Sequence, residues 1–197
     1  MDTEIEATFT DINPEEVRKR LADIGARLKQ PERLMRRKIF DYPDGRLKRI
    51  SGWIRLRDEG DKVTLAYKQL NDRTIHGTKE VSVVVSDFER AERFFVSIGL
   101  DLTSYQETKR ESWELEETEI EIDTWPWIPS FVEIKGREER IVKAVAARLG
   151  FGWQDAKHGS VENIYQELYD VTEEEVDSWR EIVFTPVPEW LRAKQRE

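Results

Sequence analysis

The chain contains no cysteine, which excludes disulfides, thiolate metal sites and thiol nucleophiles from its chemistry. Its two histidines, His76 and His158, stand too far apart in sequence to predict a metal-binding pair, so we expect ordinary loop residues. No apolar run approaches the roughly 20 residues of a membrane span, and the acidic start is unlike a signal peptide. These absences lead us to expect a cytoplasmic protein that does not bind membranes.

A basic excess is also lacking, because 32 Lys and Arg residues face 41 Asp and Glu residues, a net charge of −9. General affinity for nucleic acid needs a basic excess, so nucleic acid is not an expected partner, although a local basic pocket is compatible with this balance. The 197 residues are enough for one domain with a real core. The 37% of charged residues then lie on a heavily charged surface or in a charged interior.

What the chain does have is alternation, beginning with its first strand-like stretch. Side chains alternate across a strand, so Ile5, Ala7 and Phe9 share one face while Glu4 and Glu6 share the other. Two carboxylates on one face repel each other unless a cation or basic groups lie opposite. A solvated strand face also explains one such pair, but several later strands repeat the arrangement with paired acids or paired bases.

Alternation, turn residues and capping residues together predict an α+β protein with a mainly antiparallel sheet. Strands are predicted at residues 4–9, 36–42, 53–57, 62–68, 79–85, 108–115, 119–124 and 130–135, with a further one at 163–168. Helices are predicted over residues 13–24, 87–98, 137–149 and 172–179, followed by a loosely held C-terminal arm. Closure into a barrel would place the charged faces in a lumen, whereas an open sheet with charged faces in water fits the periodicity equally well.

If the charged faces point inward, the lumen holds acids and bases together. They are Glu4, Glu6, Glu80, Asp123 and Glu133 alongside Arg55, Arg57, Lys68 and Arg110. Such a mixture suits a divalent cation bound to a polyphosphate, because Mg²⁺ or Mn²⁺ takes carboxylate and phosphate oxygens while Arg and Lys neutralise the remaining charge. Catalysis would rest on positioning and charge stabilisation, with water or a ribose hydroxyl as nucleophile.

Short motifs follow one another in a specific order between residues 4 and 168. They are Glu4-x-Glu6, Asp41-Tyr42-Pro43-Asp44-Gly45, Trp53-Ile54-Arg55-Leu56-Arg57, Thr64-Leu65-Ala66-Tyr67-Lys68, Arg110 ahead of Asp123, Phe131-Val132-Glu133-Ile134, and the region 160–168. This series resembles the CYTH family, which includes class IV adenylyl cyclases and thiamine triphosphatases within the triphosphate tunnel metalloenzymes. The resemblance implies an eight-stranded antiparallel β-barrel with flanking helices, and metal-dependent chemistry on triphosphates in its charged tunnel.

Carried over residue by residue, the resemblance implies three overlapping groups of site residues. The catalytic group is Glu4, Glu6, Arg110 and Glu133. The ligands of Mg²⁺ or Mn²⁺ are Glu4, Glu6, Asp123 and Glu133. The triphosphate-binding group is Arg55, Arg57, Lys68, Arg110 and Lys135.

The chain departs from the family pattern at three positions. Thr8 stands where the family has lysine, while Ser82 and Lys135 stand where it often has a second acid. Losing a lysine at Thr8 removes a phosphate contact, and Lys135 disfavours a metal by direct repulsion. We hypothesise that Lys135 reaches the phosphate that the missing lysine would hold.

The resulting expectation is a tunnel domain over residues 1–170, with a C-terminal helix and tail over residues 171–197. Its ligand is a nucleotide or other organic triphosphate, or tripolyphosphate, and a homodimer is an open possibility. Cyclisation of ATP and phosphohydrolysis are both compatible with the resemblance, which leans slightly towards the cyclase branch. The alternative function is triphosphate binding without catalysis. Trp125-Pro126-Trp127 fits either a packed turn or a platform that stacks on an aromatic ligand.

Overall fold

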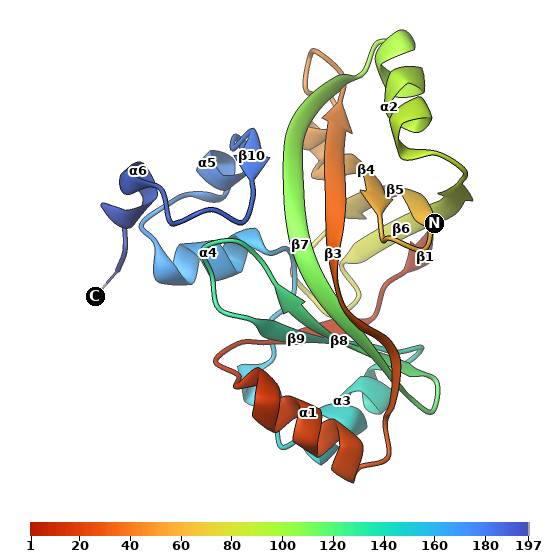
Figure 1. Cartoon of the computed structure of the whole chain (residues 1–197), viewed down its shortest axis with the longest axis vertical. Helices are drawn as coiled ribbons and strands as arrows, with labels where there is room; N and C mark the ends of the chain where they lie inside the picture. Colours follow the sequence, from red (N-terminus) through yellow and green to blue (C-terminus); the bar gives the residue numbers. More distant parts are fainter. Residues whose placement is uncertain (197) are drawn as a thin grey trace.

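Two long antiparallel strands, β3 (Arg27–Asp41) and β7 (Asp101–Leu115), form the spine of the computed structural model, which describes residues 1–196 (Figure 1). A curled sheet extends from both sides of this spine in the order β1-β6-β5-β4-β3-β7-β8-β9-β2. The other strands on this path are β1 (Asp2–Thr3), β2 (Glu6–Phe9), β4 (Gly52–Asp58), β5 (Val63–Leu70), β6 (Thr78–Val85), β8 (Thr118–Thr124) and β9 (Phe131–Lys135). Neighbours on the path run antiparallel, as predicted.

The N-terminal segment links the two edges of this sheet. β1 pairs with β6 at one edge and β2 pairs with β9 at the other; β2 lies within the predicted strand 4–9, whereas β1 precedes it and was not predicted. The break falls at Glu4 and Ile5, where the Glu4 amide donates to the Thr78 carbonyl and Ile5 accepts from the Gly136 amide. Counted as one strand, this segment and β3–β9 make up the eight strands of the predicted tunnel. The α+β class and the tunnel fold are confirmed.

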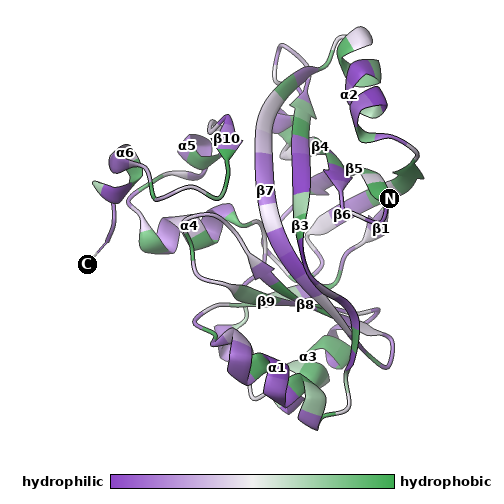
Figure 2. Ribbon diagram, viewed as in Figure 1, coloured by the Kyte–Doolittle hydropathy of each residue, from purple (hydrophilic) through white to green (hydrophobic). Residues whose placement is uncertain are grey.

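Two helices cover the outer face of β2, β8 and β9. They are α1 (Pro14–Asp23), capped by Asn13 as predicted, and α3 (Glu139–Arg148). Their apolar stripes pack against strand residues in one buried cluster, in which Leu21 and Ile134 are fully buried. Figure 2 shows hydrophilic segments along both spine strands, as expected for strands whose inner faces are polar.

The helix α2 (Phe88–Ser97) covers the far end of the sheet. Asp87 caps it by accepting a hydrogen bond from the Arg90 amide, as the sequence predicts. Phe95 faces inward and packs on Phe40, with ring centroids 5.1 Å apart. No helix within residues 1–196 is long and apolar enough to cross a membrane.

The C-terminal part of the chain differs from two expectations. The predicted strand at 163–168 is wrong, because these residues form the helix α4 (Glu162–Leu168), with Tyr165 buried on its inner side. The arm expected to be loose instead forms α6 (Glu189–Arg192), whose Leu191 is fully buried. Between them lie α5 (Glu173–Asp177), with the predicted capping box at Thr172, and β10 (Glu181–Ile182), which pairs in parallel with β7.

Candidate functional site

The inner face of the curled sheet encloses a cavity of about 1340 Å³. Its walls carry most of the residues that the sequence predicts for the site: Glu6, Arg55, Arg57, Lys68, Arg110, Asp123, Glu133 and Lys135. Glu4 joins them through ion pairs with two of the lysines. The alternative of an open sheet with its charged faces in water is therefore wrong, because these side chains point into the interior.

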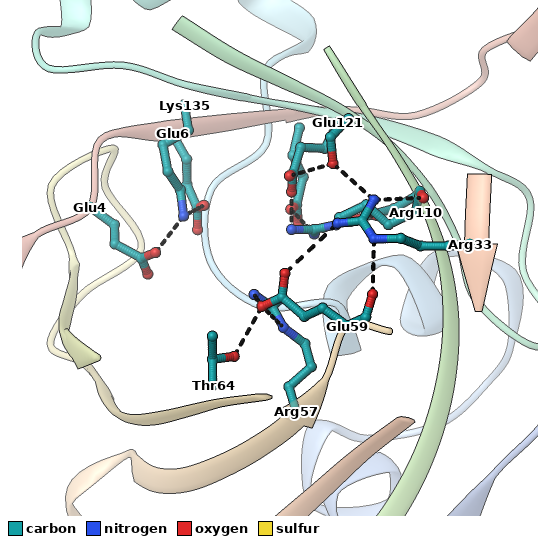
Figure 3. A network of polar contacts seen from close by, with 12 residues as sticks. Glu4, Glu6, Arg33, Arg57, Glu59, Thr64, Arg110, Glu121 and Lys135 are labelled. Atoms are coloured by element: carbon teal, nitrogen blue, oxygen red, sulfur yellow. Dashed lines mark hydrogen bonds and ion pairs between the residues drawn. The ribbon is translucent and has the colours of Figure 1, made fainter. Parts of the chain in front are cut away.

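Glu4 lies between two ammonium groups on one side of the cavity, and Figure 3 shows its contact with that of Lys135. Lys135 Nζ is 2.5 Å from Glu4 Oε1 and 3.5 Å from Glu6 Oε2, and Lys68 Nζ is 2.6 Å from Glu4 Oε2. The contact between Glu6 and Lys135 follows from strand pairing, since the two residues lie directly opposite each other, as Lys68 and Glu80 do. Lys68 also contacts Glu80 at 2.9 Å.

This arrangement fixes the charges of the group. Burial would raise the pKa of Glu4, but the charges of Lys135 and Lys68 outweigh it and hold that pKa well below its ordinary value. Burial opposes the charge of Lys135, yet Glu6 and Glu4 raise its pKa above that of a free lysine. Lys135 therefore carries a full positive charge that two carboxylates already compensate.

A second cluster surrounds Arg110. Arg110 lies directly opposite Asp123, and its Nε is 2.6 Å from Asp123 Oδ1. The same guanidinium contacts Glu133 at 2.8 Å and also forms an ion pair with Glu121. Glu121 and Glu133 lie directly opposite each other on β8 and β9, where like charges destabilise a sheet unless a cation lies between them. Arg110 supplies that cation.

The Arg110 cluster contains the best ligand set for a metal. Oxygens of Glu121, Asp123 and Glu133 lie within 4.8 Å of one another. Burial and the charge of Asp123 raise the pKa of Glu133, so bringing a cation close would favour its ionised form. Three carboxylates suit Mg²⁺ or Mn²⁺, which prefer oxygen ligands. These oxygens also hold Arg110, so a metal would compete with its guanidinium.

The predicted metal ligands thus fall into two groups. Asp123 and Glu133 meet around Arg110, whereas Glu4 and Glu6 surround Lys135. The sequence analysis missed Glu121 as a ligand, although it stands two residues before Asp123 and therefore shares a strand face with it.

Glu59 forms a third cluster that the sequence analysis also missed. Its carboxylate accepts from Arg57 at 2.6 Å and from Thr64 at 3.0 Å, and it lies 3.7 Å from Arg33 (Figure 3). Glu59 follows β4 in a turn, where glutamate is usually exposed, so no local pattern marks it as an interior residue. Only the curl of the sheet brings it inside.

The structure also places Trp125, from the predicted turn, and Arg55, from the predicted triphosphate-binding group. Trp125 is 7% exposed and belongs to a buried cluster with Tyr165, so the structure supports the packed turn at residues 125–127. Arg55 is buried, and burial together with Arg57 lowers its pKa to about 10. Its single carboxylate contact, to Glu80, is long at 3.5 Å, and its Nε has no hydrogen-bond partner among the described residues.

A comparison with known protein families identifies the family to which this fold belongs. The model of the CYTH domain matches residues 3–149. The chain belongs to the CYTH family. No curated protein sequence matches the chain significantly.

Solved structures agree with this CYTH fold. A protein of Pyrococcus horikoshii matches with a TM-score of 0.67 and 21% identity, covering 82% of this chain and 98% of that one. A candidate adenylate cyclase from Vibrio parahaemolyticus matches with a TM-score of 0.73 and 14% identity, covering 84% and 98%. A candidate adenylyl cyclase from Hippeastrum, described as having a dominant triphosphatase activity, matches with a TM-score of 0.55 and 13% identity, covering 90% and 95%. At these identities the likeness shows the fold alone.

Proposed function

We propose that this CYTH protein binds an organic or nucleoside triphosphate in its tunnel and hydrolyses it in a reaction that needs Mg²⁺ or Mn²⁺. One observation carries the proposal: a group of three carboxylates lies in the same cavity as several buried cations. Carboxylates alone would suit a cation, and bases alone would suit an anion. Both together match a metal–triphosphate complex.

The proposed roles follow from the contacts. The residues proposed to bind phosphate oxygens are Arg55, Arg57, Lys68 and Lys135, and Arg110 stabilises negative charge that develops during phosphoryl transfer. The residues that would hold the metal are Glu121, Asp123 and Glu133, and the bound ion would neutralise phosphate charge and acidify a water molecule. Glu4 and Glu6 remain proposed as catalytic and metal-binding carboxylates, and in the structure they position Lys135 and Lys68.

Cyclisation of ATP is the second candidate reaction. The cavity of about 1340 Å³ is larger than the 300–1,000 Å³ typical of small-molecule sites, so it has room for a nucleoside beside the phosphates. Against it, Trp125 is only 7% exposed and the guanidinium of Arg37 lies over its ring, which leaves little of this side chain for a base to stack on. Because Trp125 gives so little support for binding a base, we place hydrolysis before cyclisation.

Product analysis tests the proposal. We expect ATP, tripolyphosphate or thiamine triphosphate, incubated with Mg²⁺ or Mn²⁺, to release inorganic phosphate, and Glu6→Ala and Glu133→Gln to reduce the rate. Cyclic AMP and pyrophosphate from ATP would establish cyclisation instead. Binding without turnover of any of the three would replace catalysis with a triphosphate-binding role, as Thr8, Ser82 and Lys135 would then suggest.

We further propose that the tunnel domain spans residues 1–170 and that the segment after it packs on the same domain. In support, β10 pairs with β7, and Val176 and Ile182 line the cavity. Residue 197, the last of the predicted tail, lies outside the described residues. The homodimer and the cytoplasmic location stay predictions, which a solution molecular mass and cell fractionation would test.

A further inference from the structure

Arg37 has an unusual position among the cations of the cavity. Six guanidinium groups line it, and four of these have a carboxylate within 4 Å: Arg33, Arg55, Arg57 and Arg110. The other two, Arg37 and Arg180, have none among the described residues. Within residues 1–196 the Nε of Arg37 is also buried without a hydrogen bond. Its guanidinium lies over the ring of Trp125, 4.7 Å from the centroid.

The strand register makes the positive charge of Arg37 energetically unfavourable. Arg37 lies directly opposite Arg57 on β4, and like charges in that position repel. Burial and the nearby charges of Arg55 and Arg57 depress the pKa of Arg37 well below its ordinary value. The ring of Trp125 and the more distant charge of Asp123 offset this repulsion only in part, whereas an anion in the cavity would remove it.

The cations of neighbouring strands are compensated to different extents. Arg37, Arg55 and Lys68 lie on β3, β4 and β5, each diagonal to the next across the sheet. Lys68 contacts two carboxylates at 2.6 and 2.9 Å, Arg55 contacts one at 3.5 Å, and Arg37 contacts none of those described. Uncompensated positive charge therefore increases along this row towards Arg37.

We propose that Arg37, together with Arg55, forms the subsite for the terminal phosphate of the bound triphosphate. This rests on the triphosphate function proposed above. The terminal phosphate is the most highly charged group of the ligand, because it alone has a second ionisation near neutral pH. It therefore binds where the positive charge is least compensated. Trp125 holds the guanidinium of Arg37 against its ring and leaves the donor edge for the phosphate.

Calorimetric titration with tripolyphosphate, at fixed ionic strength and without metal, tests this subsite. We expect Arg37→Gln to weaken binding by about tenfold to a hundredfold, the effect of losing a charge-assisted hydrogen bond. The affinity of Arg37→Lys should fall between those of the wild type and Arg37→Gln. Lysine keeps the positive charge but lacks the planar guanidinium that can donate two parallel hydrogen bonds and stack on an aromatic ring. The matched control is Arg36→Gln at the exposed neighbour, which is paired with Asp58 and should change affinity less than twofold.

A comparison of nucleotides tests the assignment to the terminal phosphate. Arg37→Gln should weaken ATP binding more than ADP binding, and an equal loss for both would overturn the assignment. The melting temperature without ligand distinguishes a binding role of Arg37 from a structural one. The proposal predicts that Arg37→Gln melts no lower than the wild type, because the substitution removes an uncompensated charge.

Three results would contradict the subsite. A lower melting temperature with unchanged affinity would make Arg37 a structural residue. Unchanged affinity in Arg37→Gln, with the wild type binding tripolyphosphate and ATP, would overturn the subsite while leaving the proposed function intact. A wild type that binds neither compound would overturn both.

Discussion

Arg110 compensates three carboxylates that come from two neighbouring strands. Its side chain is 14% exposed, so neither it nor its partners are well solvated. Removing one partner of a buried ion pair leaves an uncompensated charge, which costs much more than the net contribution of the pair. The same three carboxylates are the proposed metal ligands, so stability and metal binding are linked at this residue.

Arg110→Ala should lower the free energy of unfolding by about 3–5 kcal/mol, because three carboxylates lose their cation. Mn²⁺ should restore part of that loss and should stabilise the variant more than the wild type, since the ion no longer competes with a guanidinium. Urea denaturation with and without Mn²⁺ measures both effects. Arg137→Ala, at an exposed pair with Glu117, is the control. Equal stabilisation of wild type and variant by Mn²⁺ would argue against a metal at Glu121, Asp123 and Glu133.

The depressed pKa of Glu4 predicts a pH dependence of stability. Its folded pKa lies below the unfolded value of about 4.3, so its contribution is fully present above that value and is lost as the pH falls towards the folded pKa. The difference in unfolding free energy between wild type and Glu4→Gln should thus be constant above about pH 5 and should shrink below about pH 4. Denaturant unfolding across pH 3–7 checks this. A difference that does not depend on pH would mean that Glu4 is not held ionised by Lys68 and Lys135.

At the scale of elements, even a very short strand has a large role. β1 has two residues, yet with the Glu4 amide it supplies the contact of the N-terminal segment with β6. Backbone groups along a sheet edge exchange their hydrogens faster when they lose their partner strand.

Deleting residues 1–3 should therefore speed hydrogen exchange in the segment 78–80, with little change in β4, which pairs with β3 and β5. Hydrogen exchange followed by mass spectrometry measures both segments in one experiment. A deletion of residues 194–196 at the other end is the control. Unchanged exchange at 78–80 would show that β1 does not protect this edge.

The elements were predictable to the extent that their signals are local. Helix caps at Asn13, Asp87 and Thr172 and the hairpin of β4 and β5 follow from neighbouring residues. The first half of β3 was missed because residues 27–35 include Pro31 and show no regular alternation of polar and apolar residues. Pairing with β7 makes them a strand. Arg33 remained unassigned for that reason, whereas Arg37 lies in the predicted strand 36–42 but was not placed among the predicted site residues. The helix α4 was taken for a strand because its burial depends on contacts with distant residues, including the hydrogen bond from the Tyr165 hydroxyl to the Pro126 carbonyl.

For the whole molecule, the family motifs give the tunnel but not the pairing of charges inside it. Which acid meets which base depends on register and on the curl of the sheet, which join residues as distant as Glu4 and Lys135. The sequence therefore identifies most of the charged residues of the cavity. It does not reveal that Arg110 is shared by three acids or that Arg37 has no carboxylate partner among the described residues.

The linking of both sheet edges by the N-terminal segment also sets an order of events during synthesis. β2 leaves the ribosome before its partner β9, which follows about 125 residues later and takes roughly 6–25 s at typical translation rates. Until then β2 has no partner strand, and Glu4 has no Lys135. The cavity is consequently completed late, by the pairing of residues far apart in the chain, which is the slowest kind of contact to form in a folding protein.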